Sequence, residues 1–408
     1  MKRFAVLVLA SLTCLLLPTS VAAAPAHGLP AATAPLSLPE SPADGGGRSL
    51  VIRGTPDADF ITVQQDADGS LLVNVNGAPQ TVADTDIANL VVDGGAGDDT
   101  ITVDPVVTAG QFILGGAGDD TIMGGNGSDV IYGGPGEDLI VCGAGDCYVD
   151  GGPGDDHIFG GAGDDIIFAG DGNDELVAGD GDGLMAGGPG ADSFSGGSDQ
   201  ARIVAQRDET VDSPGKVTLA PLTSTDAAGN EPGTELRVAG GATFRQQVDS
   251  DITALLSLPA GRRLLAAIDD ARPRVMIERS DHGDQTTILV PAAAFLQAGG
   301  LLGSGSASTI SYDPFETVID GGTEAWQVRP PLVGLFHELV HAYNAATGTL
   351  QPGKAGGVFK LELQAVGLPF NGIAYRLSPS SDPDDQNPRG FTENEFRALL
   401  RLPERMAY

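Results

Sequence analysis

Residues 115–195 read GGAGDDTIM-GGNGSDVIY-GGPGEDLIV-CGAGDCYVD-GGPGDDHIF-GGAGDDIIF-AGDGNDELV-AGDGDGLMA-GGPGADSFS, which are consecutive nine-residue units without an insertion. The units follow the pattern G-G-x-G-x-D-x-U-x, in which U is apolar. The eighth position is apolar in every unit: Ile122, Ile131, Ile140, Val149, Ile158, Ile167, Leu176, Met185 and Phe194. A disordered Gly/Asp linker has no reason to keep an apolar residue at this strict spacing. The period therefore predicts a parallel β-roll or β-helix.

Each residue type in the unit has a physical role. Glycine allows left-handed backbone in the turn, and the apolar residue stacks on its equivalents in neighbouring turns. The sixth position supplies the hard carboxylate oxygen that Ca²⁺ prefers. The unit resembles the repeat-in-toxin (RTX) nonapeptide, which implies calcium binding. The predicted calcium ligands, one of them in a degenerate upstream copy, are Asp99, Asp120, Asp129, Asp138, Asp156, Asp165, Asp174 and Asp192.

Two units depart from the pattern at the sixth position. Cys147 replaces the Asp of its unit, and Cys142 replaces the first Gly of the same unit. In an oxidising compartment a Cys142–Cys147 disulfide could hold this turn as calcium holds the others, whereas the alternative is a pair of free thiols. Gly183 also lacks the carboxylate, and Asp182 beside it is the candidate substitute. Calcium occupancy is therefore in question at both units.

The charge of the chain excludes some partners and requires others. Its formal net charge is −33, and residues 93–199 contain 22 Asp and Glu but no Lys or Arg. Such a chain repels nucleic acid and anionic membranes and attracts multivalent cations. Because so many carboxylates resist compaction, the repeat block requires a counter-ion.

The N-terminus has the features of an export signal. Lys2 and Arg3 precede an apolar stretch, residues 4–17, that is too short for a comfortable membrane span. Small residues at Ala22 and Ala24 suit cleavage before Pro25. We therefore expect a secreted, extracellular protein without stable membrane insertion after cleavage. A membrane anchor is the alternative.

A second motif lies in the C-terminal third. Residues 331–348 read PLVGLFHELVHAYNAATG and predict one helix, with Pro331 in the first turn and Gly348 at the C-terminal cap. His337 and His341, four residues apart, fall on one helix face and can reach the same Zn²⁺. Glu338 is then placed to take a proton from the attacking water. The alternative is two histidines that are merely packed or solvated.

The third zinc ligand is less directly indicated. The extended metzincin pattern requires Gly at 344 and His at 347, but this chain has Asn344 and Thr347, which excludes that type. Glu362 follows 21 residues after His341 in an expected second helix, and three protein ligands leave the open position of a catalytic zinc. His282 is the upstream alternative, and Glu362 could instead be a solvated acid.

Four motifs in the same order resemble the effector-protein zinc metallopeptidase family, best known from bacterial type III effectors. They are residues 303–308 (GSGSAS) with 312–314 (YDP), 337–344 (HELVHAYN), 362–368 (ELQAVGL), and 392–400 (TENEFRALL) followed by Pro403-Glu-Arg405 and Tyr408. The resemblance implies a small zincin-like α+β domain that cleaves protein substrates. It implies His337, His341 and Glu362 as zinc ligands and Glu338 as general base.

We therefore predict a multidomain protein in which a parallel β-roll or β-helix precedes a zincin-like α+β domain. The expected parts are a signal peptide (1–24), a disordered leader (25–49), a β-rich region with degenerate repeats (50–114), the calcium-binding β-roll (115–199), a linker (200–240) and a zinc metallopeptidase-like domain (241–408). The expected function is zinc-dependent hydrolysis of peptide bonds in protein substrates. The alternatives are a calcium-dependent extracellular binding or surface protein with an inactive peptidase-like domain, and a purely structural repeat protein.

Overall fold

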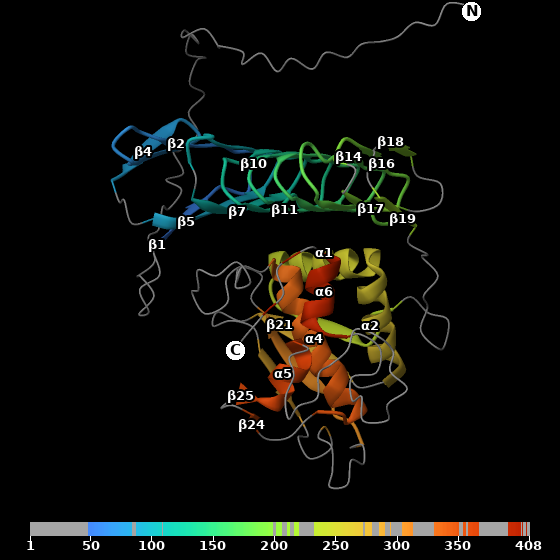
Figure 1. Cartoon of the computed structure of the whole chain (residues 1–408). Coiled ribbons are helices and arrows are strands. Elements are labelled where there is room, and N and C mark those ends of the chain that lie inside the picture. The colour runs from blue at the N-terminus through green and yellow to red at the C-terminus, as the bar shows by residue number, and fades with distance from the viewer. Residues whose placement is uncertain are drawn as a thin grey trace, which may run out of the picture. The chain divides into compact units, whose positions relative to one another are not determined.

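The computed structural model describes residues 48–83, 87–107, 109–198, 201–205, 210–212, 216–219, 232–271, 274–279, 285–289, 294, 304–312, 330–350, 354–355, 358–366, 391–400, 402 and 405. The predicted signal peptide and nearly all of the predicted leader lie outside these ranges. The described residues form a β-solenoid from the repeats and a unit of mixed helices and strands from the C-terminal third (Figure 1).

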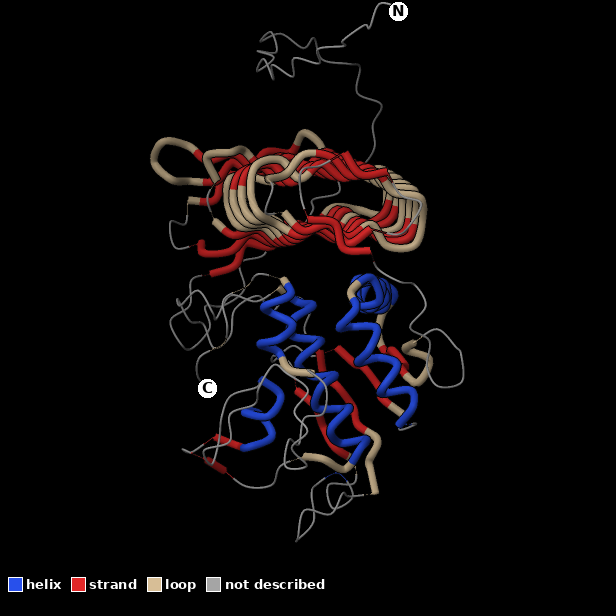
Figure 2. Tube along the Cα trace, turned by 45° about the vertical axis from the view of Figure 1, so that its right-hand side comes forward, coloured by secondary structure: helices blue, strands red, loops and turns tan. Residues whose placement is uncertain are grey.

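Two stacked sheets make up the solenoid (Figure 2). Sheet A contains, in spatial order, β1 (Arg48–Arg53), β5 (Ile87–Ala96), β7 (Gly110–Ala117), β9 (Val130–Tyr132), β11 (Tyr148–Pro153), β13 (Ile166–Asp171), β15 (Leu184–Ala186), β17 (Arg202–Ala205) and β19 (Lys216–Leu219). Sheet B contains β18 (Thr210–Asp212), β16 (Ser193–Ser195), β14 (Glu175–Val177), β12 (His157–Ala162), β10 (Leu139–Ala144), β8 (Thr121–Met123), β6 (Thr100–Val103), β2 (Phe60–Gln65), β3 (Leu71–Val75) and β4 (Ala78–Val82).

Consecutive units alternate between the sheets, so each full turn of the solenoid uses two units. In sheet B, for example, Ile122 aligns with Ile140, which aligns with Ile158 of the following turn. The eighth-position side chains fill the space between the sheets, and none of them is more than 2% exposed. The parallel solenoid predicted from the nine-residue period is thus confirmed, and the apolar position is its core.

Close stacking of the turns explains the glycines. Gly116 and Gly118 adopt φ values of 119° and 134°, which L side chains rarely adopt. A Cβ at either position would also collide with a backbone carbonyl of the turn before it, that of Gly95 or Gly97. The degenerate region before the regular repeats joins the same stack, since β2 pairs with β6 in parallel, and β3 and β4 extend sheet B as an antiparallel hairpin.

The C-terminal unit is built on a four-stranded mixed sheet. Its strand order is β20 (Leu236–Ala239), β21 (Val275–Arg279), β23 (Ser308–Tyr312) and β22 (Gln285–Ile288), with β22 antiparallel at the edge. The helices are α1 (Ala242–Ser257), α2 (Pro259–Ala271), α4 (Pro331–Thr347), α5 (Lys360–Val366) and α6 (Glu393–Leu399), and β24 (Lys354–Ala355) pairs with β25 (Val358–Phe359). None of the helices described is long and apolar enough to cross a membrane.

Helix α4 is the centre of this unit. It begins with Pro331 and ends at Gly348, whose left-handed backbone (φ 69°) forms the C-cap, as the sequence predicts. It contacts the other four described helices and the strands β22 and β23. Nearly every α4 side chain is consequently buried, including those of His337, Glu338 and His341. Polar groups at such depth require partners, because an unpaired buried polar group is costly.

Helix α1 contacts strands β11 and β13 of the solenoid. Its Asp251 accepts hydrogen bonds from Tyr132 and Tyr148 of sheet A at 3.3 and 3.4 Å, and from Tyr312 of β23 at 2.8 Å. Burial raises the pKa of Asp251 well above its ordinary value. This carboxyl group therefore links the outer face of sheet A to the core of the C-terminal unit.

Candidate active site and calcium sites

Three side chains from two helices converge in the C-terminal unit. His337 and His341 lie one turn apart on α4, and their Nε2 atoms are 3.1 Å apart. Glu362 Oε2, from α5, lies 3.4 Å from His337 Nε2 and 3.2 Å from His341 Nε2. The structure thus brings together the three residues that the sequence suggested as zinc ligands. The competing ligand, His282, lies outside the described residues.

The spacing of these three atoms can be compared with that of a metal site. A tetrahedral zinc with ligand bonds of about 2.0–2.1 Å separates neighbouring ligand atoms by about 3.3 Å. The three observed separations, 3.1, 3.2 and 3.4 Å, lie on either side of that value. Two imidazoles and one carboxylate leave a fourth position open, which suits a catalytic rather than a structural ion. Calcium fits this donor set poorly, because it takes six or more oxygen ligands at longer distances of about 2.3–2.6 Å.

Helix α5 is held in place by polar contacts to the end of α4. The Gln364 side chain, fully buried, donates hydrogen bonds to Asn344 Oδ1 at 3.4 Å and to the Thr349 carbonyl at 3.3 Å. Gln364 and Glu362 are only two residues apart, so these contacts fix the position from which Glu362 reaches the histidines. Asn344, which excluded the metzincin pattern, has a structural role here.

Glu338 lies beside the ligand triangle and is oriented by a threonine. Thr286 of β22 donates a hydrogen bond of 2.6 Å to Glu338 Oε2. The other carboxylate oxygen, Oε1, lies 4.0 Å from His337 Nε2. One oxygen is therefore held by the sheet while the other faces the site. No pattern in the sequence singles out Thr286, because its role depends on the packing of an edge strand against α4.

A second carboxylate, not selected from the sequence, contacts the back of His337. Glu393 Oε2, at the start of α6, lies 2.9 Å from His337 Nδ1. Arg397 Nε donates to Glu393 Oε1 at 2.6 Å, and Arg405 lies 3.3 Å from Oε2. Glu393 and Arg397 are both fully buried. A carboxylate on the distal nitrogen of a metal-ligating histidine fixes the ring and increases its basicity, and Glu393 is placed to have this effect on His337.

Electrostatics reinforce this arrangement. Burial alone would lower the pKa of His337, but the carboxylates Glu362, Glu393 and Glu338 outweigh it and raise the pKa to about 9. Burial likewise opposes ionisation of Glu362 and Glu393, yet the histidines, with Arg397 and Arg405 for Glu393, hold both pKa values well below the ordinary range. Without a metal ion these carboxylates therefore favour the protonated form of His337. A cation that binds to His337 competes with that proton.

The predicted calcium ligands occupy the turns of the solenoid. Each projects its carboxylate inward, and its Oδ1 accepts a backbone N–H from the turn before, as Asp138 does from Asp120 at 2.8 Å. The Oδ2 atoms are buried and have no hydrogen-bond partner among the described residues at Asp99, Asp120, Asp129, Asp138, Asp156, Asp165 and Asp174. Such orphaned oxygens fit a hard cation that binds through oxygen.

Burial is costly for these carboxylates when no cation is bound. It raises the pKa of Asp156 to about 9, with neighbouring carboxylates adding to the shift. It raises the pKa to about 7 at Asp120, Asp129, Asp138 and Asp174, and to about 6 at Asp99 and Asp165. A divalent cation removes this penalty by pairing with the ionised form.

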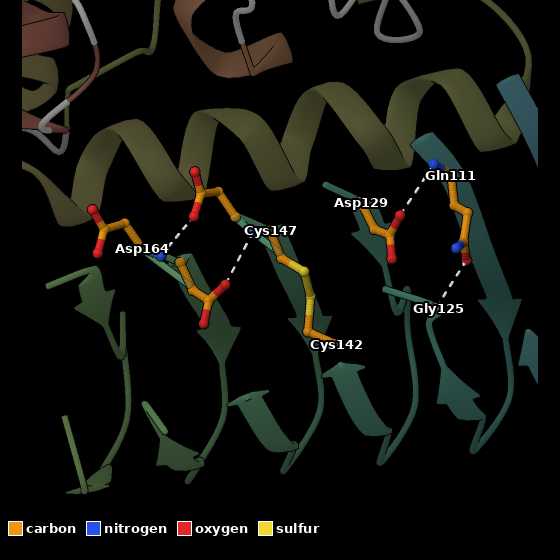
Figure 3. The surroundings of a disulfide bond; sticks show 8 residues. Gln111, Gly125, Asp129, Cys142, Cys147 and Asp164 are labelled. Carbon is orange, nitrogen blue, oxygen red and sulfur yellow. Dashed lines mark hydrogen bonds between the residues drawn. A yellow bond between two sulfur atoms is a disulfide. The ribbon is translucent and has the colours of Figure 1, made fainter. Parts of the chain in front are cut away.

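Cys142 and Cys147 are joined by a disulfide across their turn, with Cα atoms 6.5 Å apart (Figure 3). The turn before it is tied by Gln111, which donates its backbone N–H to Asp129 at 3.1 Å and accepts the N–H of Gly125 at 3.2 Å. Asp182, the candidate substitute for the carboxylate missing at Gly183, belongs to the neighbouring outer row, where its N–H donates to Asp164 Oδ1 at 2.7 Å and its own Oδ1 accepts a hydrogen bond from Ser198 Oγ.

Protein-family models match both the repeats and the C-terminal unit. Residues 232–408 match the family model Peptidase_M91, described as "Effector protein". Residues 91–104, 112–146 and 150–185 match the RTX calcium-binding nonapeptide repeat, a model of four copies. These matches confirm the two resemblances drawn from the sequence: calcium-binding RTX repeats are followed by a peptidase-family effector domain. No curated protein and no solved structure matches the chain.

Proposed function

We propose that this chain is an exported zinc-dependent peptidase whose RTX repeats bind calcium outside the cell. The observation that carries the proposal is the triangle of His337 Nε2, His341 Nε2 and Glu362 Oε2, with separations of 3.1–3.4 Å, beside a carboxylate suited to act as base. The family match supports a protein substrate and a zincin-like fold for this unit. The predicted signal peptide supports export, and the acidic repeats argue against a nucleic-acid partner.

The proposed mechanism divides the work among a few residues. Zinc held by His337, His341 and Glu362 would polarise the scissile carbonyl and lower the pKa of the attacking water. Glu338 accepts the proton of that water at Oε1, because its other oxygen is held by Thr286. Glu338 then passes the proton to the leaving amine nitrogen. Glu393 keeps the His337 ring in one orientation through Nδ1.

Separate substitutions at the base and at a ligand test this proposal. Glu338→Gln in the full chain should bind zinc as the wild type does but lose peptidase activity on a protein substrate, because an amide cannot accept the proton. Glu362→Ala should lose zinc and activity together, since two imidazoles alone hold the metal poorly. His282→Ala and Glu278→Gln, the latter on β21 away from the site, should change neither property.

Two results would contradict it. Zinc lost in His282→Ala but kept in Glu362→Ala would make the upstream histidine the third ligand. If wild type binds zinc but cleaves no protein, the alternative of a calcium-dependent binding protein with an inactive peptidase-like domain is favoured.

A further inference from the structure

The sixth-position residues of the repeats form two rows, one along each edge of the solenoid. Because successive units alternate between the edges, equivalent residues on one edge are two units apart. The first edge, which we name the continuous row, contains Asp99, Asp120, Asp138, Asp156, Asp174 and Asp192. The opposite edge, which we name the interrupted row, contains Asp129, Cys147, Asp165 and Gly183.

Backbone hydrogen bonds establish these two rows. Along the continuous row the N–H of each aspartate donates to Oδ1 of the next: Asp99 to Asp120 at 2.7 Å, Asp120 to Asp138 at 2.8 Å, Asp138 to Asp156 at 2.9 Å, Asp156 to Asp174 at 2.8 Å and Asp174 to Asp192 at 3.0 Å. Every turn on this edge therefore places the backbone N–H of its aspartate against the carboxylate of the next aspartate in the row. Asp59 precedes the row: its N–H donates to Asp99 Oδ1 at 2.7 Å, but its own carboxylate accepts hydrogen bonds from Thr55 and Asn76.

In the turns of Asp99, Asp120, Asp138 and Asp156, the position that a Cβ on the first glycine would occupy is a small space bordered by oxygen atoms. A Cβ built on Gly115 would collide with Asp120 Oδ2 and with the carbonyl oxygen of Gly133. The same holds one turn on, where a Cβ on Gly133 would meet Asp138 Oδ2 and the Gly151 carbonyl. The space thus borders the carboxylate of its own turn and a carbonyl of the next turn, and the next carboxylate in the row accepts the N–H of that same aspartate, as Asp138 does from Asp120. Two carboxylates can share one cation there.

The interrupted row never offers two consecutive carboxylates. Asp129 is followed by Cys147, whose sulfur is in the disulfide, and Asp165 is followed by Gly183. A carbonyl is still present, since a Cβ on Gly160 would meet Asp165 Oδ2 and the Ala178 carbonyl. Only the second carboxylate is missing. Calcium affinity decreases when a site has fewer charged ligands, so a space with one carboxylate is a much weaker calcium site than a space with two.

We propose that calcium fills the continuous row alone, and that the Cys142–Cys147 disulfide and the Gln111 contacts hold the opposite edge without it. A regular repeat block would bind calcium along both edges. In this chain one edge responds to calcium and the other to the redox state of a single cysteine pair. The disulfide spans the turn between the two lone aspartates, where a carboxylate at position 147 would otherwise share one ion with each of them.

Matched substitutions, one on each edge, test the proposal. Asp138 and Asp165 are both buried, both accept one backbone N–H through Oδ1, and both have an orphaned Oδ2. They differ in whether the neighbouring turn supplies a carboxylate. In the oxidised full chain, calcium bound at saturation is counted by equilibrium dialysis. Asp138→Asn should lose about two ions, because its carboxylate borders two successive spaces. Asp165→Asn should lose none.

A gain of binding provides the second arm. The double variant C142G/C147D restores a carboxylate at position 147, between Asp129 and Asp165, and should bind about two ions more than the wild type. This arm decides the question even if Asp138→Asn fails to fold. The proposal is overturned if Asp165→Asn loses as many ions as Asp138→Asn, or if C142G/C147D binds no more calcium than the wild type.

Discussion

Replacing Glu393 by Gln separates the orientation of His337 from the stability of the fold. The carboxylate lies 2.9 Å from His337 Nδ1, and the substitution removes this charged contact with the ring. Loss of such a partner costs about 10–100-fold in metal affinity, or about 1.4–2.8 kcal/mol. The same change leaves Arg397, fully buried, without its counter-charge, and breaking a buried pair costs about 3–5 kcal/mol of folding stability.

The two effects require two assays on the full chain with calcium present. Zinc affinity is measured by competition with a chromophoric chelator below the unfolding temperature, and stability by thermal unfolding followed by circular dichroism. Arg405→Gln, which removes the contact at 3.3 Å to Glu393 Oε2, serves as a control and should lower the melting temperature but leave zinc affinity close to that of wild type.

A double variant decides between the two roles of Glu393. E393Q/R397M removes the buried carboxylate together with its closer partner and leaves only Arg405 of the two arginines, so stability should recover in large part relative to Glu393→Gln, since replacing both members of a buried pair is far less costly than removing one. Zinc affinity should stay low, because the carboxylate on His337 is still absent. If affinity recovers along with stability, or never falls in Glu393→Gln, Glu393 is only a structural residue and our reasoning is refuted.

Two further predictions concern the repeats. In chelator, the raised aspartate pKa values of about 6–9 mean that protonation stabilises the metal-free solenoid, so its β-structure by circular dichroism should persist near pH 5 and be lost as the pH rises through 9. Calcium should abolish this pH dependence. A metal-free chain that is more folded at pH 9 than at pH 5 would contradict the account. Cys142 and Cys147 should be oxidised in exported protein, so the intact mass after alkylation should show no label until reductant is added. Two labelled thiols without reductant would mean that the interrupted row has no cross-link.

The architecture of the repeats could be predicted from the sequence because one physical pattern repeats without a break. The eighth position of every unit is buried between the two sheets, as Ile122 and Ile158 show, so it requires an apolar residue in each turn. The nine-residue period also implies the two rows. Cys147 and Gly183 are separated by an even number of units, so they must lie on the same edge when each turn uses two units. That consequence depends on the two-units-per-turn geometry, which the structure makes explicit.

The candidate active site was predictable in part. His337, Glu338 and His341 lie within one helical turn, so helix periodicity alone places them together. Glu362 was reached through the requirement for a third ligand and a resemblance, and its approach to within 3.4 Å of both histidines depends on how α5 packs on α4. Thr286 and Glu393 lie on other elements, and no local pattern relates either to α4. Glu393 did have one sequence signal, an Arg four residues later on the same helix face.

The zinc content of the full chain, purified in calcium without added zinc and measured by inductively coupled plasma mass spectrometry, tests the central claim most directly. The account predicts one zinc per chain, peptidase activity that disappears when a zinc-selective chelator removes the ion, and recovery of activity when zinc is returned. A chain that is folded and calcium-loaded but binds no zinc, or that cleaves protein equally well after the ion is removed, would contradict it.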